Sequence, residues 1–298
     1  MTGRSALVTG ATGFIGSALA RRLLAEGWQV HLLVRSGSAP FSAAAGPAPR
    51  IHVHDGTSAG LRGIVADARP DVAFHLASLF LAQHAPDDIE RLVGSNVLFS
   101  TQLAEAMVQA GAHRLVNTGT SWQHYQDGAY DPVCLYAATK QAFDAILHYY
   151  ATCTPLHTIT LKLFDTYGPG DPRPKLMHLL RKTAESGAHL AMSPGGQLID
   201  LVYVDDVIDA FMAAAQRLLA DEAAPLEEYG VSSGAPLPLR DLAATFARVA
   251  GKPLDIDWGG RPYRPREVMQ PWTGYRTLPG WQPRVPLEQG LARLLSES

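Results

Sequence analysis

The 298-residue sequence predicts an α/β fold in which a doubly wound parallel sheet is followed by a smaller C-terminal lobe. Three observations support this prediction. In the first half of the chain, short aliphatic and β-branched runs alternate with longer helical patterns, as in repeated βαβ units. A glycine-rich turn lies between the first strand and the first helix. After Phe164 the alternation gives way to segments rich in proline, glycine and arginine.

The predicted elements follow one another in the order that a parallel sheet requires. The first strand is Ser5–Thr9, and the first helix covers residues 18–26 and ends at Gly27. Further short apolar strands are predicted at residues 28–34, 51–53, 72–76 and 114–117, with helical stretches between them. Two more units combine a helix over 136–151 with a strand over 158–163, and a strand over 201–204 with a helix over 207–219. Strands joined in this way form a parallel sheet with helices on both faces.

The turn after the first strand reads TGATGFIG over residues 9–16 and has a specific chemical use. The first glycine allows a tight turn, the second lets the backbone approach a pyrophosphate, and the third lets the helix pack on the strand. The N-terminus of the helix then faces the phosphates. The pattern predicts a dinucleotide-binding site that includes Gly10, Thr12, Gly13, Phe14, Ile15 and Gly16.

Together, these patterns predict two parts of the chain with different tasks. Residues 1–165 are expected to form a dinucleotide-binding Rossmann domain, to which residues 200–232 return. Residues 166–298 are expected to form mainly a substrate-binding lobe, with loops over 168–174 and 259–271. The lobe would lie over the carboxyl edge of the Rossmann-type doubly wound parallel sheet, where ligands bind in such folds. A further loop is predicted over residues 43–50, which are rich in alanine, proline and glycine.

Composition excludes several classes of protein. With 47% hydrophobic and 18% charged residues, the chain is neither disordered nor collagen-like. A net charge of -3 and the absence of a Lys/Arg run give no reason to expect nucleic acid. The two cysteines, Cys134 and Cys153, argue against a disulfide-built secreted scaffold. No segment reads as a membrane span or signal peptide, so we expect a cytoplasmic protein that has no membrane partner.

Tyr136 and Lys140 lie four residues apart in a predicted helix and therefore share one face of it. A free tyrosine has a pKa of about 10, and a nearby ammonium lowers this pKa toward the operating pH because it stabilises the phenolate. Lys140 is the only lysine before Lys162, in a chain that otherwise uses arginine. Thr120 offers a hydroxyl that can hydrogen-bond to the carbonyl oxygen on which such a tyrosine acts. This arrangement predicts a tyrosine acid that acts on a carbonyl group.

Several motifs occur in the order found in the extended short-chain dehydrogenases/reductases, the NAD-dependent epimerase/dehydratase family, and the chain resembles that family over most of its length. The glycine turn resembles the GxxGxxG signature, and Tyr136 with Lys140 matches YxxxK. Residues 75–78, 96–101, 161–169 and 203–206 look like the HxAA, NVxGT, R-x-x-N-x-Y-G-P and VxD segments. The resemblance implies that Thr120, Tyr136 and Lys140 are the catalytic residues.

The second strand is expected to end at the position that selects the cofactor. NAD-preferring sites place a carboxylate there for the ribose 2′-hydroxyl, whereas an arginine suits a 2′-phosphate. This chain has Arg35 followed by Ser36, which predicts NADPH/NADP. Asp55 matches the family aspartate that contacts adenine. The other residues expected to bind the cofactor are Gly56, Leu76, Ala77, Ser78, Thr118, Tyr136, Lys140 and Phe164.

The substrate residues are expected near the catalytic group and in the C-terminal lobe. Residues 264–267 resemble the R-P-G-D segment with which nucleotide-sugar enzymes hold a diphosphate, and an arginine fork suits phosphate. Asp165 replaces the asparagine of the family, which removes two donors and adds charge beside a diphosphate. Recognition of sugar hydroxyls is therefore the expected role of Asp165. The full set of predicted substrate residues is Thr120, Ser121, Trp122, Asp165, Arg173, Lys175 and Arg264.

No metal site is predicted. His52 and His54 alternate on one strand beside Asp55, but no third ligand occurs at a recognisable spacing. Cys134 lies two residues before Tyr136 and is expected to serve packing, because a reductase of this type needs no thiol.

The resemblance implies an NADP-dependent oxidoreductase that reduces the 4-keto group of a CDP- or dTDP-linked keto-deoxysugar, as nucleotide-sugar 4-ketoreductases do. An NAD(P)-dependent nucleotide-sugar epimerase with tightly bound cofactor is the main alternative. A 4,6-dehydratase is disfavoured because Ser121, Trp122 and Gln123, rather than Asp-Glu, follow Thr120.

Two further alternatives remain open: a reductase of carbonyls without a nucleotide, and a binding protein without enzymatic activity. The segment at Arg264 argues against the first, and the retained tyrosine argues against the second. The predicted helices near 88–110 and 136–151 resemble those that form a four-helix contact in the family, which implies a homodimer.

Overall fold

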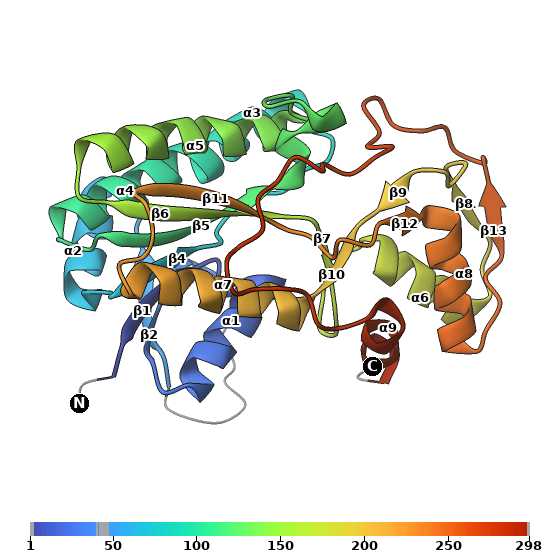
Figure 1. Cartoon of the computed structure of the whole chain (residues 1–298), viewed down its shortest axis with the longest axis horizontal. Coiled ribbons are helices and arrows are strands. Elements are labelled where there is room, and N and C mark those ends of the chain that lie inside the picture. Colours follow the sequence, from blue (N-terminus) through green and yellow to red (C-terminus); the bar gives the residue numbers. More distant parts are fainter. Residues whose placement is uncertain (1–2, 40, 42–47, 297–298) are drawn as a thin grey trace.

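A computed structural model of the chain describes residues 3–39, 41 and 48–296. Its centre is a seven-stranded parallel sheet of order β11-β6-β5-β4-β1-β2-β3 (Figure 1). The strands of this sheet are β1 (Ser5–Thr9), β2 (Gln29–Arg35), β3 (Arg50–His54), β4 (Val72–His75), β5 (Arg114–Thr120), β6 (His157–Leu163) and β11 (Leu226–Val231). The strand order reverses between β1 and β4, and a reversal of this kind opens a ligand crevice at the carboxyl ends. The predicted Rossmann-type fold class is confirmed.

Helices cover both faces of the sheet because β1 sends alternate side chains to two separate cores. Leu7 packs in one core with α2 (Ser58–Ala68), α4 (Phe99–Gln109) and α5 (Leu135–Cys153). Ala6 and Val8 pack in the other core with α1 (Phe14–Ala25) and α7 (Val204–Leu219). Figure 1 shows α4 and α5 on one side of the sheet and α1 and α7 on the other.

Short helical segments precede α4 and α5 in the chain. The short helix α3 (Ile89–Val93) follows the 3₁₀ turn η1 (Pro86–Asp88) and continues through the π-helical turn η2 (Gly94–Leu98) into α4. Two further 3₁₀ turns, η3 (Ser121–Gln123) and η4 (Tyr125–Asp127), lead from β5 toward α5. The chain therefore approaches α5 from the carboxyl end of β5.

Several predicted boundaries are wrong: α7 begins at Val204 rather than at residue 207, and two further errors lie at the glycine turn and at the end of β5. The helix α1 begins at Phe14 rather than at residue 18, because extended Gly13 already serves as its N-cap. The strand β5 continues to Thr120 rather than ending at residue 117, because Thr120 still pairs with Leu163 of β6. Thr118 and Thr120 are therefore part of the strand instead of following it.

The predicted strand over residues 201–204 forms, but it does not join the main sheet. β10 (Leu201–Tyr203) pairs in parallel with β7 (Asp165–Tyr167) in a separate two-stranded sheet. The position next to β6 is filled by β11, where Leu226 pairs with Thr158. The chain therefore leaves the main sheet after β6 and returns to it only at β11.

The remaining elements lie together at one end of the molecule, on the right in Figure 1. They are α6 (Leu176–Ser186), β8 (Leu190–Met192), β9 (Leu198–Ile199), β12 (Leu237–Pro238), α8 (Leu239–Ala250), β13 (Ile256–Trp258) and α9 (Leu287–Ser296). The division of the chain near residue 165 stays a prediction. Of the predicted loop over 43–50, residues 43–47 lie outside the part that the structure describes.

The segment that resembled VxD has a structural role at the start of α7. The buried carboxylate of Asp206 accepts hydrogen bonds from the backbone amides of Arg284 and Val285, both at 3.0 Å. The indole of Trp281 donates to the Asp206 carbonyl at 2.9 Å. These bonds fix the chain that leads into α9 against α7. Across residues 3–39, 41 and 48–296, no helix is long and apolar enough to cross a membrane.

Candidate functional site

The glycine turn has the geometry of a phosphate-binding loop. Gly10 has a φ of 74°, and a Cβ on it would lie 2.6 Å from the amide nitrogen of Ala77. A Cβ on Gly16 would lie 2.2 Å from the carbonyl oxygen of Gly10. Only glycine fits at these two positions, so β1, β4 and α1 approach closely. The N-terminus of α1 then points its free amides toward the crevice, where a pyrophosphate fits.

Buried polar side chains fix the strand ends that surround this turn. Thr9 Oγ1 lies 2.8 Å from His75 Nδ1 and accepts a hydrogen bond from the Ala77 amide at 3.1 Å. His75 Nε2 lies 2.8 Å from Ser100 Oγ on α4. Burial lowers the pKa of His75 to about 3, with Lys140 acting in the same direction, so the ring is neutral. His75 therefore serves as a structural link between β1, β4 and α4.

Asn96 of the NVxGT-like segment links the loop after β4 to α5. Its Nδ2 donates to the Leu79 carbonyl and to Thr139 Oγ1, both at 3.0 Å. Its Oδ1 accepts from Ser78 Oγ at 3.1 Å and from the Leu79 amide at 2.8 Å. Because Thr139 lies between Tyr136 and Lys140, these bonds hold the loop against the part of α5 that carries these two residues.

A cavity of about 230 Å³ lies at the carboxyl edge and brings most predicted site residues together. Its lining includes the predicted residues Gly10, Gly13, Phe14, Ile15, Gly16, Leu76, Ser78, Thr118, Thr120, Ser121, Trp122, Tyr136, Lys140, Phe164, Asp165, Arg173 and Lys175. The predicted residues outside this lining are Thr12, Arg35, Ser36, Asp55, Gly56, Ala77 and Arg264. Four of these lie at the same edge of the sheet: Arg35 ends β2, Ser36 follows it, and Asp55 and Gly56 follow β3.

Tyr136 is buried in this cavity near the start of α5. Its ring meets the ring of Phe80 edge-on, with centroids 5.0 Å apart. Burial raises the pKa of Tyr136, and a hydrogen bond with Ser78 acts in the opposite direction. The shift is opposite to the one expected from Lys140 alone, because burial outweighs the nearby charges. Tyr136 therefore holds its proton at neutral pH.

Lys140 lines the same cavity one helical turn later and is 3% exposed. Burial lowers the pKa of Lys140 to about 8, while the charge of Asp144 acts in the opposite direction. Thr120 ends β5, where its amide donates to Gln123 Oε1 at 3.0 Å and its Oγ1 accepts from the Trp122 amide at 3.3 Å. The three residues face one cavity from two elements, which suits proton donation to a bound carbonyl oxygen.

The residues at the ends of β2 and β3 form the outer part of the site. The side chain of Arg35 is exposed. Its backbone amide donates a hydrogen bond to Ser38 Oγ at 3.1 Å. Asp55 Oδ1 accepts from the amide and the hydroxyl of Thr57, both at 2.8 Å, which holds the carboxylate at the start of α2. Hydrogen bonds from Thr57 lower the pKa of Asp55, which is exposed. The outer part of the site therefore has a cation, Arg35, at the end of β2 and a carboxylate, Asp55, just after β3.

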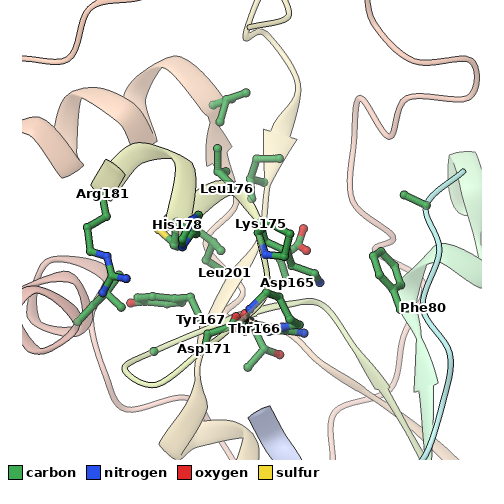
Figure 2. A pocket seen from close by; sticks show the side chains of 18 of the residues that line it. Phe80, Asp165, Thr166, Tyr167, Asp171, Lys175, Leu176, His178, Arg181 and Leu201 are labelled. Carbon is green, nitrogen blue, oxygen red and sulfur yellow. Dashed lines mark hydrogen bonds and ion pairs between the residues drawn. The ribbon is translucent and has the colours of Figure 1, made fainter. Parts of the chain in front are cut away.

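A second cavity of about 600 Å³ adjoins the first and opens toward the C-terminal lobe. Figure 2 shows Lys175 beside Asp165, with Phe80 across the cavity and His178 and Arg181 on α6. Phe80 lines both cavities, and the ammonium of Lys175 lies 4.5 Å from the centre of its ring. This cavity offers aromatic and cationic side chains next to Tyr136 and Lys140.

Arg173 and Arg264, which are predicted to bind substrate, are each paired with a carboxylate. Arg173 donates from Nε and Nη2 to Asp171 at 2.6 Å and lies over the ring of Phe14. Arg264 donates from Nε and Nη2 to Glu267 at 3.1 and 2.8 Å and lies over the ring of Trp122. A phosphate would therefore share or displace these carboxylate partners.

Asp165 lies where the two cavities meet. Burial raises the pKa of its carboxyl, while Lys175, Arg173 and Arg264 act in the opposite direction. Burial lowers the pKa of Lys175, while Asp165 acts in the opposite direction. The Asp165 carboxylate can accept hydrogen bonds from a neutral donor such as a hydroxyl. The surrounding cations favour its charged form.

Several residues of the site are not predicted from the sequence. Phe80 follows β4 without a recognisable motif. Gln123, Asp144 and Lys162 form a polar cluster behind Lys140. Two signals could have indicated the cluster: Asp144 follows Lys140 by four residues, and Lys162 is a rare lysine within an apolar strand. Among the described residues, no group of three or more His, Cys, Asp or Glu side chains could hold a metal ion.

Comparison with known proteins defines the class. Residues 6–225 match the NAD dependent epimerase/dehydratase family, so the chain belongs to this family of enzymes. The resemblance noted from its motifs is thereby confirmed.

Individual relatives match nearly the whole chain. A UDP-glucose 4-epimerase of Mycolicibacterium smegmatis is 30% identical and covers 96% of each chain. A CDP-abequose synthase of Salmonella typhimurium is 25% identical and covers 97% of this chain and 96% of the relative. The structure of MoeE5 in complex with UDP-glucuronic acid and NAD matches with a TM-score of 0.86 and 25% identity, over 98% of both chains.

Proposed function

We propose that the protein reduces the 4-keto group of a nucleotide-activated keto-deoxysugar, CDP- or dTDP-linked, with NADPH as reductant. The observation that carries the proposal is Tyr136, a buried, protonated tyrosine that shares one cavity with Thr120, Lys140 and the glycine turn. The adjoining cavity supplies cations for a nucleotide sugar. The segments 117–125, 164–169 and 263–269 resemble CDP-abequose synthase and the ketoreductases of deoxysugar pathways, which supports the reaction type.

The residues that would hold the cofactor lie along the carboxyl edge. The free amides at the N-terminus of α1, which follow the turn of Gly10 and Gly13, suit the pyrophosphate. Arg35 suits a 2′-phosphate, because a guanidinium forms strong charge-assisted bonds with phosphate. Asp55 would contact the adenine, and Lys140 would hold the nicotinamide ribose. When bound, NADPH supplies the hydride for the carbonyl carbon.

The chain's own residues handle the proton. As negative charge develops on the sugar carbonyl oxygen, Tyr136 donates its phenolic proton to it as general acid. The Thr120 hydroxyl donates a hydrogen bond to the same oxygen and holds it in position. The Lys140 ammonium then stabilises the phenolate that remains on Tyr136. Asp165 accepts hydrogen bonds from sugar hydroxyls, and Arg173, Lys175 and Arg264 offer donors to the diphosphate.

A second candidate is a nucleotide-sugar epimerase that retains its cofactor. The 30% identity with the Mycolicibacterium smegmatis UDP-glucose 4-epimerase favours it. The same tyrosine, threonine and lysine would serve both reactions, so the two functions differ in whether NADPH is consumed.

The cofactor preference can be tested at Arg35. The Arg35→Ala variant is expected to bind NADPH about 10- to 100-fold more weakly, because it loses a charge-assisted pair worth about 1.5–3 kcal/mol. Its affinity for NADH should not change. Steady-state kinetics with each cofactor measure the ratio of kcat/KM for NADPH to kcat/KM for NADH.

The matched control is Arg50→Ala. Arg50 is also an exposed arginine, but it starts β3 at the opposite edge of the sheet, where it pairs with Asp67 at 2.9 Å. Its NADPH/NADH ratio should equal that of the wild type. If Arg35→Ala also keeps the wild-type ratio, Arg35 does not select the cofactor.

We also propose a homodimer through the surface of α3, α4 and α5. Exposed apolar side chains lie on α3 (Ile89 and Val93), on the turn η2 that leads into α4 (Leu98) and on α5 (Tyr149). Burial of such side chains in a two-fold contact between identical helices would remove them from water.

A further inference from the structure

A buried cluster of charged side chains lies behind Lys140, on the side away from the glycine turn. Its centre is Lys162 on β6, which is 1% exposed. The Lys162 ammonium donates to His124 Nε2 at 2.7 Å and to Glu228 Oε2 of β11 at 2.8 Å. Its third neighbour is Asp144 Oδ2 of α5, at 3.6 Å. Lys162 therefore has two acceptors within hydrogen-bond distance and a third partner, Asp144, at ion-pair distance.

Asp144 connects this cluster to the catalytic residues. Its Oδ2 accepts a hydrogen bond from Gln123 Nε2 at 2.7 Å, and its Oδ1 accepts from Asn117 Nδ2 at 3.4 Å. Gln123 is fully buried, and its Oε1 accepts from the amide of Thr120 at 3.0 Å. One glutamine thus joins the strand end that carries Thr120 to the helix that carries Tyr136 and Lys140.

Asp144 is also the one carboxylate of α5, the helix that carries Lys140. It follows Lys140 by one helical turn and therefore lies on the same face of α5. No ion pair within 4 Å links these two described residues, so the interaction acts through space. Two other titratable groups lie near Lys140: His75 of β4, which is neutral, and Tyr136, which shares its cavity and holds its proton.

Resting on the proposed function, we propose that Asp144, held by Gln123 and Lys162, is a positioning residue that keeps the Lys140 ammonium charged during turnover. The proposed mechanism needs this charge, because Lys140 stabilises the phenolate left on Tyr136. Burial works against the charge, and a nearby carboxylate opposes that effect. Gln123 and Lys162 fix the carboxylate at the required place.

The charges around Asp144 agree with this role. Burial raises the pKa of Asp144 to about 6, while Lys162, Gln123 and Lys140 act in the opposite direction and Glu228 acts in the same direction as burial. Asp144 is therefore ionised at neutral pH. Lys140, with a pKa of about 8, loses its proton within the range in which an enzyme can be assayed. Removal of the Asp144 charge should lower the pKa of Lys140 further.

The test measures the proton affinity of Lys140 directly. Acetic anhydride labels only uncharged amines, and peptide mass spectrometry of the whole protein reports each of the five lysines separately. The rate of Lys140 acetylation against pH gives its midpoint, with exposed Lys182 as internal reference. In Asp144→Asn the midpoint should fall by about one pH unit, and the alkaline limb of kcat/KM should move to lower pH with it.

Two further variants separate charge from packing. Asp144→Glu keeps the charge and should keep the wild-type midpoint. Glu105→Gln removes a carboxylate of α4 that accepts a hydrogen bond at 2.9 Å from Tyr150. Tyr150 lies on α5 ten residues after Lys140, so this variant should also leave the midpoint unchanged. An unchanged midpoint in Asp144→Asn, or equal shifts in Asp144→Asn and Asp144→Glu, would overturn the proposal. The labelling needs no substrate, so failure of the proposed reaction would be seen separately.

Discussion

Replacement of Tyr136 by phenylalanine is expected to lower kcat by about 10²- to 10⁴-fold, because the reaction loses its general acid. The loss should fall on the chemical step. The ring contact with Phe80 remains in the variant, and only the hydroxyl with its hydrogen bond to Ser78 is removed. The thermal shift caused by NADP should therefore stay within the range of the wild type.

Tyr150→Phe is the matched control for this variant. Tyr150 is also a buried tyrosine of α5, and its hydroxyl donates to Glu105 at 2.9 Å, remote from the cavity. Its removal should change stability slightly and leave kcat intact. If Tyr136→Phe and Tyr150→Phe had similar kcat values, Tyr136 would not be the acid.

The second large effect is expected from Gly16→Ala. The new Cβ would lie 2.2 Å from the Gly10 carbonyl oxygen, so the turn must move away from α1. Displacement of this backbone should weaken binding of NADP by at least about tenfold and destabilise the fold by about 1–3 kcal/mol. Titration calorimetry and thermal unfolding with and without NADP measure the two effects.

Gly63→Ala tests whether a helical glycine as such causes the effect. Gly63 lies in α2, where a Cβ would meet nothing within 4 Å. Alanine there should stabilise the protein by up to about 1 kcal/mol, because it favours helix, and should not affect NADP binding. Normal NADP binding by Gly16→Ala would mean that the turn does not hold the cofactor.

The sequence predicts the sheet well because its strands follow a simple pattern. The buried parallel strand Ser5–Thr9 has an apolar centre at residues 6–8, and its two neighbours in the sheet also contain short apolar runs. That Tyr136 and Lys140 line one cavity is also predictable, because they lie one helical turn apart. The class of fold and the order of the main motifs follow from such local signals.

Contacts between distant segments are what the sequence does not reveal. The pairing of β10 with β7 depends on β11 filling the place beside β6, more than 60 residues after β6 ends. The carboxylate partners of Arg173 and Arg264 depend on loop conformations. The cluster of Asp144, Lys162 and Glu228 joins three elements, and no single motif contains all three residues.

The most direct test of the proposed function is the fate of NADPH. The protein would be incubated with NADPH and an enzymatically generated CDP- or dTDP-4-keto-6-deoxyhexose, with absorbance loss and product mass followed together. A reductase consumes NADPH stoichiometrically and adds two hydrogens to the sugar, and both changes should vanish in Tyr136→Phe. An isomerised product of unchanged mass, with NADPH untouched, would contradict the account and identify an epimerase.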